Sequence, residues 1–305
     1  MQDVVVIGGS FAGWTAALQL GRASRDVLVV DAGSPRNRTS PAAHGVPGWD
    51  GTPPADILLR FRNDATTYPT VSHVDGRVTG VRGAQDRFEV QLGTGATVGA
   101  RRVLLAHGVR DTLPDLPGVA EAWGTSVLHC PYCHGYEVRG APLAVLANHP
   151  MSTHQACLLQ ADWSAEVTLL TGLDGAPAVE DLKGTCIAIE PRRIAQLIPE
   201  AEGIGVAFAG GQTAQFRAMF VAPRVDLDGT PADMLGCACA EGPLGPYVQV
   251  GPMGQTTVPG VFAAGDCARP AHNVTSAIGD GATAGIGCHQ SLVFPEMIQA
   301  LERAA

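Results

Sequence analysis

The chain has 305 residues, of which 46% are hydrophobic and 16% charged, and a formal net charge of −9 with an isoelectric point near 5.4. This length suffices for about two domains, each with its own hydrophobic core. A negative field attracts neither nucleic acid nor an anionic membrane surface, so neither partner is expected. No apolar run approaches the ~18 residues of a membrane span, and no basic export signal opens the chain, which predicts a cytoplasmic protein.

The first sixty residues contain a nucleotide-binding pattern. An apolar run at residues 4–7 leads into Gly8, Gly9, Ser10, Phe11, Ala12 and Gly13, a helical pattern follows, and a second apolar run at residues 27–30 ends on Asp31. Strand, glycine turn, helix, strand and terminal acid at this spacing predict a dinucleotide site, with the acid on a ribose hydroxyl. Ser10 replaces the second glycine of the pattern but is still small. The alternative is a tight connection without a ligand.

Loops and a small sheet follow this pattern. Arg36 and Arg38 could bind the same pyrophosphate or could belong to a solvated basic turn, and the sequence leaves both open. Glycine and proline indicate a loop at residues 44–51. Alternating segments at residues 77–81, 88–92 and 97–98 predict an antiparallel sheet, and a separate buried strand is expected at residues 103–106.

Cys130 and Cys133, within the segment Cys-Pro-Tyr-Cys-His-Gly-Tyr-Glu, are spaced to form a redox disulfide. The alternatives are two inert core thiols or half of a zinc site. A closed zinc site needs four ligands, and Cys237 and Cys239 are one residue apart rather than the usual two to four, so no metal is expected. The remaining cysteines are interpreted as small apolar core residues, except that Cys267 could lie near a cofactor: Cys157, Cys186 and Cys288. Eight cysteines are too sparse for a disulfide scaffold.

The region after this pair repeats the strand, turn, helix, strand plan, with strands at residues 142–147 and 167–171 and a helix at residues 153–159. Its turn, at residues 148–152, has none of the glycines that let backbone amides reach a pyrophosphate. The sequence therefore predicts a second domain that kept the architecture and lost the nicotinamide site.

A buried strand near the end of the chain leads to Gly265 and Asp266, where a carboxylate could accept a hydrogen bond from a ribityl hydroxyl. A helix is expected from about Val274, and its N-terminus suits electron-rich ring atoms. The predicted fold class is α/β with two nucleotide-binding-like, Rossmann-type three-layer domains, the second inserted into the first. We expect residues 1–115 and 243–305 to form the cofactor domain and residues 118–240 the degenerate domain that carries the cysteine pair.

These patterns together resemble the low-molecular-weight thioredoxin reductases, which are FAD-dependent pyridine nucleotide disulfide oxidoreductases, over nearly the whole chain. Two features depart from them: His134 stands where they carry an acid, and the glycine turn and basic cluster for NADPH are missing. Both departures resemble the thioredoxin-reductase-like dithiol oxidases of natural-product biosynthesis, which close the disulfides of gliotoxin, holomycin and romidepsin.

The resemblance implies FAD as cofactor, without NADPH, and a homodimer. Cys130 would be the thiol that meets a small peptide or metabolite dithiol, Cys133 the sulfur next to the flavin, and oxygen the final acceptor, giving hydrogen peroxide. His134 is the candidate acid and base, the alternative being a structural histidine. The cofactor residues implied are Gly8, Ser10, Phe11, Ala12, Gly13, Asp31, Ala32, Arg36, Arg38, His44, Val78, Ala106, Gly108, Gly265, Asp266 and Val274. His107 and His129 are weaker candidates for the flavin pocket.

Two other functions stay open at this point. One is a disulfide reductase of the thioredoxin reductase type that uses a donor other than NADPH. The other is a non-catalytic flavoprotein that senses redox state.

Overall fold

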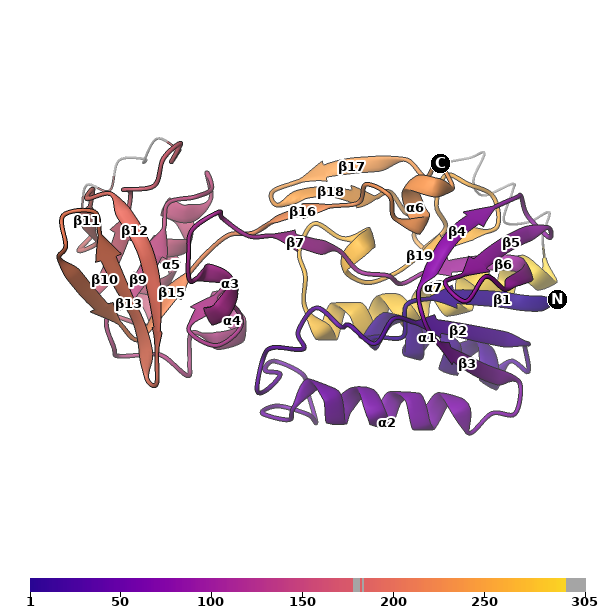
Figure 1. The fold of residues 1–305 in the computed structure, drawn as a ribbon. Helices are drawn as coiled ribbons and strands as arrows, with labels where there is room; N and C mark the ends of the chain where they lie inside the picture. The colour runs from indigo at the N-terminus through magenta and orange to yellow at the C-terminus, as the bar shows by residue number, and fades with distance from the viewer. Residues whose placement is uncertain (178–181, 183, 295–305) are drawn as a thin grey trace. The chain divides into compact units, whose positions relative to one another are not determined.

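The computed structural model describes residues 1–177, 182, and 184–294. The chain forms two compact units (Figure 1). Unit 1 contains residues 1–38, 46–110 and the chain from Val225 on, and unit 2 contains residues 39–45 and 111–224. This division differs from the expected boundaries, since residues 225–240 lie in unit 1 and residues 39–45 in unit 2. The reason for the first difference is packing, because Leu227, Ala232 and Cys237 belong to the hydrophobic core of unit 1.

Unit 1 is built on a seven-stranded sheet. Its parallel strands lie in the order β3, β2, β1, β6, β19, and β4 and β5 extend β6 as an antiparallel hairpin. The strands are β1 (Gln2–Ile7), β2 (Val27–Asp31), β3 (Val71–Asp75), β4 (Val78–Arg82), β5 (Phe88–Leu92), β6 (Thr97–Leu105) and β19 (Val261–Ala263). The two short strands expected at residues 97–98 and 103–106 are one strand, β6, whose first half pairs with β5 and whose second half pairs with β1.

Both faces of this sheet are covered, which explains why its central strands are apolar without alternation. Val4, Val5, Val6 and Ile7 of β1 are all buried. One face packs against α6 (Pro231–Met234) and the hairpin of β17 (Cys239–Gly242) and β18 (Gly245–Val248). The other helices of the unit are α1 (Phe11–Arg22), α2 (Pro54–Thr66), α7 (Val274–Val293) and the 3-10 turn η1 (Asp266–Ala268). α1 and α7 lie side by side (Figure 1).

Glycines allow α1 and α7 to approach closely. A Cβ at Gly281 would lie 2.2 Å from the carbonyl oxygen of Ala12, and one at Gly285 would lie 3.0 Å from the backbone of Ala16. This packing holds the start of α1 against the first half of α7.

Unit 2 has three layers around a parallel sheet with strand order β11, β10, β9, β15, β8. One face packs against α5 and the other against an antiparallel sheet of β12, β13 and β14. The strands are β8 (Val127–Leu128), β9 (Leu143–Leu146), β10 (Val167–Leu170), β11 (Ala188–Glu190), β12 (Ile194–Glu200), β13 (Gly203–Phe208), β14 (Thr213–Phe216) and β15 (Ala218–Phe220), and the helices are α3 (Val119–Ala122), α4 (Pro131–His134) and α5 (Ser152–Asp162).

Two strands carry the chain from one unit to the other, β7 (Arg110–Thr112) and β16 (Arg224–Asp226), and they pair with each other. The predicted fold class, with two Rossmann-type domains of which the second is inserted into the first, is confirmed. In the part of the chain that the structure describes, no helix combines the length and the hydropathy that a membrane crossing requires.

Candidate active site

The glycine turn between β1 and α1 requires glycine for steric reasons. A Cβ at Gly8 would lie 2.2 Å from the carbonyl oxygen of Ala106, and one at Gly13 would lie 1.8 Å from the carbonyl oxygen of Gly8. Gly8 also has a φ of +109°. A Cβ at Gly9 would lie 2.6 Å from Cβ of Asp31, so the turn lies directly against the acid that ends β2.

The Gly8 amide donates to the Val30 carbonyl at 2.9 Å, but the next three amides of the turn have no acceptor among the described residues. No hydrogen bond from the amide nitrogens of Gly9, Ser10 or Phe11 is found within the described ranges, and the Ser10 side chain does not cap α1. A helix N-terminus that is uncapped and approached through glycine is suited to a pyrophosphate. Unit 1 therefore has the backbone arrangement that a dinucleotide cofactor needs.

Gly265 and Asp266 follow β19 and lie at the same end of the parallel sheet. Gly265 has a φ of +77°, and a Cβ there would lie 2.9 Å from the Ala12 side chain, which brings this segment against the start of α1. Val274 is the first residue of α7, whose N-terminus is capped by the Asn273 side chain, which accepts a hydrogen bond from the Ser276 amide at 2.7 Å.

Arg36 and Arg38 differ in their contacts. Nη1 of Arg36 donates to Oδ2 of Asp266 at 3.0 Å and lies 2.7 Å from Nδ1 of His272, whereas Arg38 donates to the Pro35 carbonyl within its own turn. Arg36 thus joins the first segment of unit 1 to the predicted ribityl-binding carboxylate. The sequence could not show this pairing, because 230 positions separate the two residues.

His107 is a half-buried base at this end of the sheet. It follows Ala106, and its Nδ1 lies 2.9 Å from the carbonyl oxygen of Gly108. Its Nε2 is buried and has no hydrogen-bond partner among the described residues. Burial lowers the pKa of His107 to about 4, so the ring is neutral near pH 7. A buried nitrogen without a hydrogen-bond partner beside the glycine turn is consistent with a bound cofactor. His107 is therefore a stronger candidate for a cofactor contact than its sequence context indicated.

Two further predicted cofactor residues have contacts of other kinds. The Val78 side chain is part of the hydrophobic core of unit 1, where β4 begins. His44 lies in unit 2, and its Nε2 is 3.5 Å from Oε1 of Glu137. Ala32, the remaining predicted residue, directly follows the end of β2.

The redox pair sits on a single helical turn in unit 2. Cys130 is the N-cap of α4 and Cys133 lies within it, and the Cys133 amide donates to the Cys130 carbonyl at 3.1 Å. Residues three apart in a helix share a face, and both cysteines are half-buried. The proline at position 131 suits the first position of a helix because it has no amide hydrogen to satisfy.

Trp163 supports the opposite side of this turn. A Cβ at Gly135 would lie 2.9 Å from the Trp163 ring, and the Tyr132 ring meets that ring at 89° with centroids 5.7 Å apart. Gly135 is therefore required for close packing of the cysteine segment on the end of α5.

His134 is the last residue of α4. It follows Cys133 and lies four residues after Cys130, a spacing at which two residues are neighbours on a helix surface. Burial lowers the pKa of His134, the nearby Glu137 carboxylate opposes that shift, and His44 adds to it. The net direction is downward, so the imidazole is mainly neutral near pH 7 and can accept a proton.

The other described cysteines are poor nucleophiles or lie apart from the pair. Burial raises the pKa of both Cys267 and Cys288 to about 12. Burial also raises the pKa of Cys237, whose Sγ lies 3.7 Å from the Thr256 hydroxyl, and that of the exposed Cys239. No group of three or more histidine, cysteine or acidic side chains suited to a metal ion occurs within the described ranges.

The turn of unit 2 that corresponds to the glycine turn is closed by its own atoms. The Asn148 amide donates to the Leu146 carbonyl at 2.8 Å, and the Ser152 amide donates to the His149 carbonyl at 2.9 Å. The His149 amide donates to Oγ of Ser152 at 3.2 Å, and the Met151 amide to Nδ1 of His149 at 3.0 Å. Residue 150 is proline and has no amide hydrogen. Each amide of this turn therefore already has an acceptor.

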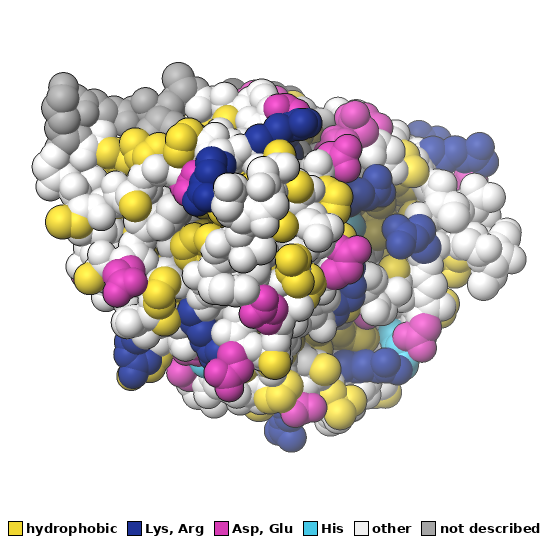
Figure 2. All heavy atoms as spheres, turned by 60° about the vertical axis from the view of Figure 1, so that its left-hand side comes forward, with side chains coloured by type: hydrophobic (Ala, Val, Ile, Leu, Met, Phe, Trp, Pro, Cys, Tyr) yellow, Lys and Arg dark blue, Asp and Glu magenta, His cyan; other side chains and the backbone are white. Residues whose placement is uncertain are grey.

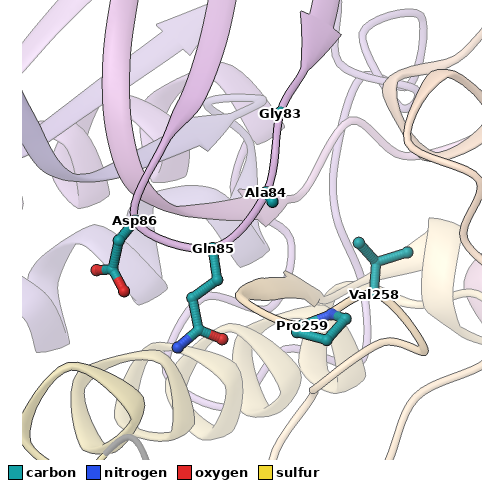
Figure 3. A pocket seen from close by; sticks show the side chains of 6 residues that line it. All are labelled: Gly83, Ala84, Gln85, Asp86, Val258 and Pro259. Atoms are coloured by element: carbon teal, nitrogen blue, oxygen red, sulfur yellow. The ribbon is translucent and has the colours of Figure 1, made fainter.

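One open hollow of unit 1 lies away from the glycine turn. An open hollow of about 360 Å³ lies between the β4–β5 turn, at Gly83–Asp86, and Val258 and Pro259 (Figure 3). Because Pro259 precedes β19 whereas Gly265 follows it, this hollow is at the opposite end of the parallel strands from the glycine turn. On the face in Figure 2, basic and acidic side chains are interspersed among the described residues.

Comparison with known proteins identifies the family. Residues 2–281 match the model of the pyridine nucleotide-disulphide oxidoreductases, and the chain belongs to this family. Thioredoxin reductase tcpT of Claviceps purpurea (strain 20.1) is 34% identical over 297 residues, which cover 93% of this chain and 92% of that protein.

Two solved structures are closely similar. The oxidoreductase from Agrobacterium tumefaciens is 42% identical with a TM-score of 0.90, covering 97% of this chain and 99% of its own. HlmI is 36% identical with a TM-score of 0.88, covering 99% of this chain and 96% of its own. The resemblance to thioredoxin-reductase-like enzymes is thus confirmed, as is an oxidoreductase of a flavoprotein family that uses FAD.

Proposed function

We propose that this protein is an FAD-dependent dithiol oxidase that forms a disulfide in a small peptide or metabolite. The observation that carries the proposal is a contrast between two turns. In the turn of unit 1 the amides of Gly9, Ser10 and Phe11 have no acceptor among the described residues, whereas the amides of residues 148, 149, 151 and 152 are all bonded within unit 2. The cysteine pair and its histidine are intact beside the closed turn, which favours electrons entering from a dithiol rather than from NADPH.

The chemistry at the pair is thiol–disulfide exchange. A substrate thiolate attacks Sγ of Cys130 in the oxidised pair, which forms a mixed disulfide and releases Cys133 as a thiolate. The second substrate thiolate then attacks the substrate sulfur of that mixed disulfide and releases Cys130. The substrate has lost two electrons and two protons, and the enzyme holds two reduced sulfurs.

His134 manages the protons of these steps. Its neutral imidazole takes a proton from an incoming thiol and returns one to a departing thiolate. Bound FAD would supply the acceptor for the two electrons held by Cys133 and their transfer to oxygen, which yields hydrogen peroxide. The residues suited to hold it are those of the Gly8–Gly13 turn, Asp31, Gly265 and Asp266.

Anaerobic rapid mixing tests the proposal. The purified holoenzyme is mixed with NADPH and, separately, with dithiothreitol while the flavin absorbance near 450 nm is followed. We expect bleaching with the dithiol within seconds and none with NADPH, followed by oxygen uptake and peroxide when air is admitted. Rapid bleaching by NADPH would remove the oxidase proposal.

Cysteine variants provide the controls. Cys130→Ser and Cys133→Ser are expected to abolish dithiol-dependent oxygen uptake, whereas Cys186→Ser, at an exposed cysteine outside the site, is expected to leave it unchanged. Unchanged oxygen uptake in the first two variants would favour a flavoprotein whose cysteines have no catalytic role.

A disulfide reductase is the second candidate, because tcpT bears the name thioredoxin reductase. This candidate predicts reduction of thioredoxin by the holoenzyme with an artificial electron donor, without oxygen uptake on small dithiols. A homodimer is part of the proposal as well, and sedimentation of the holoenzyme tests it.

A further inference from the structure

The ligand crevice of unit 2 lies where its strand order reverses. In a doubly wound sheet, ligands bind beyond the carboxyl ends of the strands, between two neighbours whose connections leave in opposite directions. In unit 2 these neighbours are β9 and β15, because α5 leads from β9 to β10 on one side, while β15 and β8 lie on the other.

Asn148 bridges this crevice. It follows β9, and its Nδ2 donates to the carbonyl of Ala222, which follows β15, at 2.6 Å, while the Ala222 amide donates back to Oδ1 of Asn148 at 3.4 Å. The space that a nucleotide would enter is thus spanned by a side chain that starts at the end of β9 and is hydrogen-bonded to the backbone of Ala222, after β15.

Gln155 connects the same crevice to the cysteine pair. It lies on α5 with 8% of its surface exposed, and its Nε2 donates to the backbone carbonyl of His129 at 2.6 Å. On its other side, Nδ1 of His129 lies 3.2 Å from the carbonyl oxygen of Val221. The residue before Cys130 is therefore held at its carbonyl by α5 and at its ring by the end of β15.

The bond from Gln155 acts directly on the geometry of Cys130. The carbonyl of His129 and the amide of Cys130 belong to one rigid peptide plane. Fixing the carbonyl oxygen fixes that plane. The φ of Cys130, −103°, sets the direction of its Cα–Cβ bond relative to the plane, and the side-chain torsion then sets the position of Sγ. A small rotation of the plane displaces Sγ of Cys130, and the rate of thiol–disulfide exchange depends on the position of the attacked sulfur.

Stability alone does not account for a glutamine here. Its Oε1 is buried and has no hydrogen-bond partner among the described residues. A buried acceptor without a partner destabilises the fold, whereas an apolar side chain of the same length would fill the space without that penalty. The hydrogen bond that Nε2 of Gln155 donates therefore explains the glutamine better than its packing does.

We propose that Gln155 is a positioning residue for Cys130 and that the former nucleotide crevice of unit 2 now anchors the redox segment. The inference rests on Cys130 being the interchange thiol of the proposed function. Gln155 itself touches neither substrate nor sulfur in this assignment, and it acts through the peptide plane of His129.

The test measures disulfide exchange without relying on oxygen or on flavin absorbance. The oxidised holoenzyme is mixed anaerobically with dithiothreitol and quenched in acid at set times, and the new thiols are alkylated and counted by peptide mass. Gln155→Met keeps the length and removes the donor, and we expect its rate of Cys130–Cys133 reduction to fall about tenfold. Asn148→Ala is the matched control, since it removes a 2.6 Å amide bond from the same crevice without touching His129. We expect Asn148→Ala to melt at a lower temperature but to exchange at the wild-type rate.

Gln155→Glu separates positioning from packing. A protonated carboxyl can donate to the His129 carbonyl, and a carboxylate cannot. Relative to wild type at each pH, we expect the exchange rate of Gln155→Glu to be about tenfold low at pH 8 and to recover as the pH falls toward 5, while the ratio for Gln155→Met stays constant. Folding of each variant is checked by flavin content.

Three outcomes would overturn the inference: a wild-type rate in Gln155→Met, an equal loss in Asn148→Ala, or a flat ratio in Gln155→Glu. Failure of the proposed function has a different signature. In that case the wild-type enzyme exchanges with the dithiol, and Gln155→Met slows the exchange, but no oxygen is consumed.

Discussion

The two half-buried histidines His107 and His134 have different environments and different consequences. For His134, burial is the largest influence on the pKa and lowers it, although Glu137 opposes this shift. For His107, burial lowers the pKa to about 4 and the hydrogen-bonding carbonyl of Gly108 opposes it only in part. The pKa of His134 is therefore shifted downward, which suits the proton acceptor of the proposed function, whereas His107 stays neutral through the physiological range.

The first prediction concerns the pH dependence of turnover. Because the pKa of His134 lies below the ordinary value of about 6.5, we expect the acid limb of kcat for dithiol oxidation to have its midpoint below pH 6.5. His134→Phe should lower kcat by about 10²-fold and remove this limb. Oxygen-electrode measurements between pH 5 and 9 check it. A limb that persists in the variant would assign the titration to another group.

The second prediction concerns stability. The unfolded chain protonates His107 near pH 6.5, but the folded protein does so only near pH 4. The contribution of His107 to the free energy of unfolding is therefore fully present above pH 6.5 and is lost as the pH falls toward 4. The loss amounts to about 3 kcal/mol. Urea unfolding at pH 7.0, 5.5 and 4.5 should show that the free energy of unfolding falls with pH in wild type and falls less in His107→Gln. The exposed His154→Gln is the control, and a wild-type slope in both variants would contradict the prediction.

At the scale of elements, the two strand–turn–helix units differ in how their turns use backbone amides. The first turn needs Gly8 and Gly13 because carbonyl oxygens occupy the positions of their Cβ atoms. The second turn has no glycine and bonds its amides to its own side chains and carbonyls. The same local architecture therefore leaves backbone amides available to a pyrophosphate in one unit and bonds them internally in the other.

The third prediction tests the first turn. Gly13→Ala forces the Gly8 carbonyl to shift, and we expect this to weaken FAD binding by about 2 kcal/mol, which is roughly thirtyfold in Kd. Fluorescence titration of the apoprotein with FAD measures it. Gly279→Ala is the control, because that helical position has open space around the added Cβ, and it should leave Kd unchanged while raising stability by about 0.5–1 kcal/mol. Equal Kd values for the two variants would contradict the steric argument.

Local patterns were sufficient for the elements that have strong apolar runs. The strand, turn and helix from β1 to α1, the strand β9 with α5, and the long α7 were all predicted near their positions. The division of β6 into two strands was wrong, because polar residues in its middle interrupt the pattern although one strand continues through them. The antiparallel sheet over unit 2 was missed, since β12–β14 are stabilised by pairing and by one apolar face rather than by a local signal.

At the scale of the whole molecule, the chain leaves unit 1 along β7 and returns along β16. Predicted cofactor residues from both ends of the sequence meet in unit 1, and the cysteine pair with the neighbouring His134 belongs to unit 2. A ligand that binds only the folded cofactor site stabilises the protein by mass action.

The fourth prediction uses this linkage to compare the two nucleotide turns. Free FAD at 100 times its Kd should stabilise the apoprotein by about 2.7 kcal/mol and raise Tm by about 4 °C. NADP⁺ at the same concentration should leave Tm of the holoenzyme unchanged, because the turn of unit 2 is closed. Differential scanning fluorimetry checks both. A clear rise of Tm with NADP⁺ would show that unit 2 still binds the nicotinamide nucleotide.

The sequence by itself determined the Rossmann-type fold class, the glycine turn, the cysteine pair and the missing glycines of the second turn, because each is encoded by residues close together in the chain. Only the tertiary structure decided that Arg36 pairs with Asp266, that Asn148 spans the crevice to Ala222, and that Gln155 holds the residue before Cys130. Those contacts join residues 26 to 230 positions apart, and no local pattern carries the strand order and packing that bring them together.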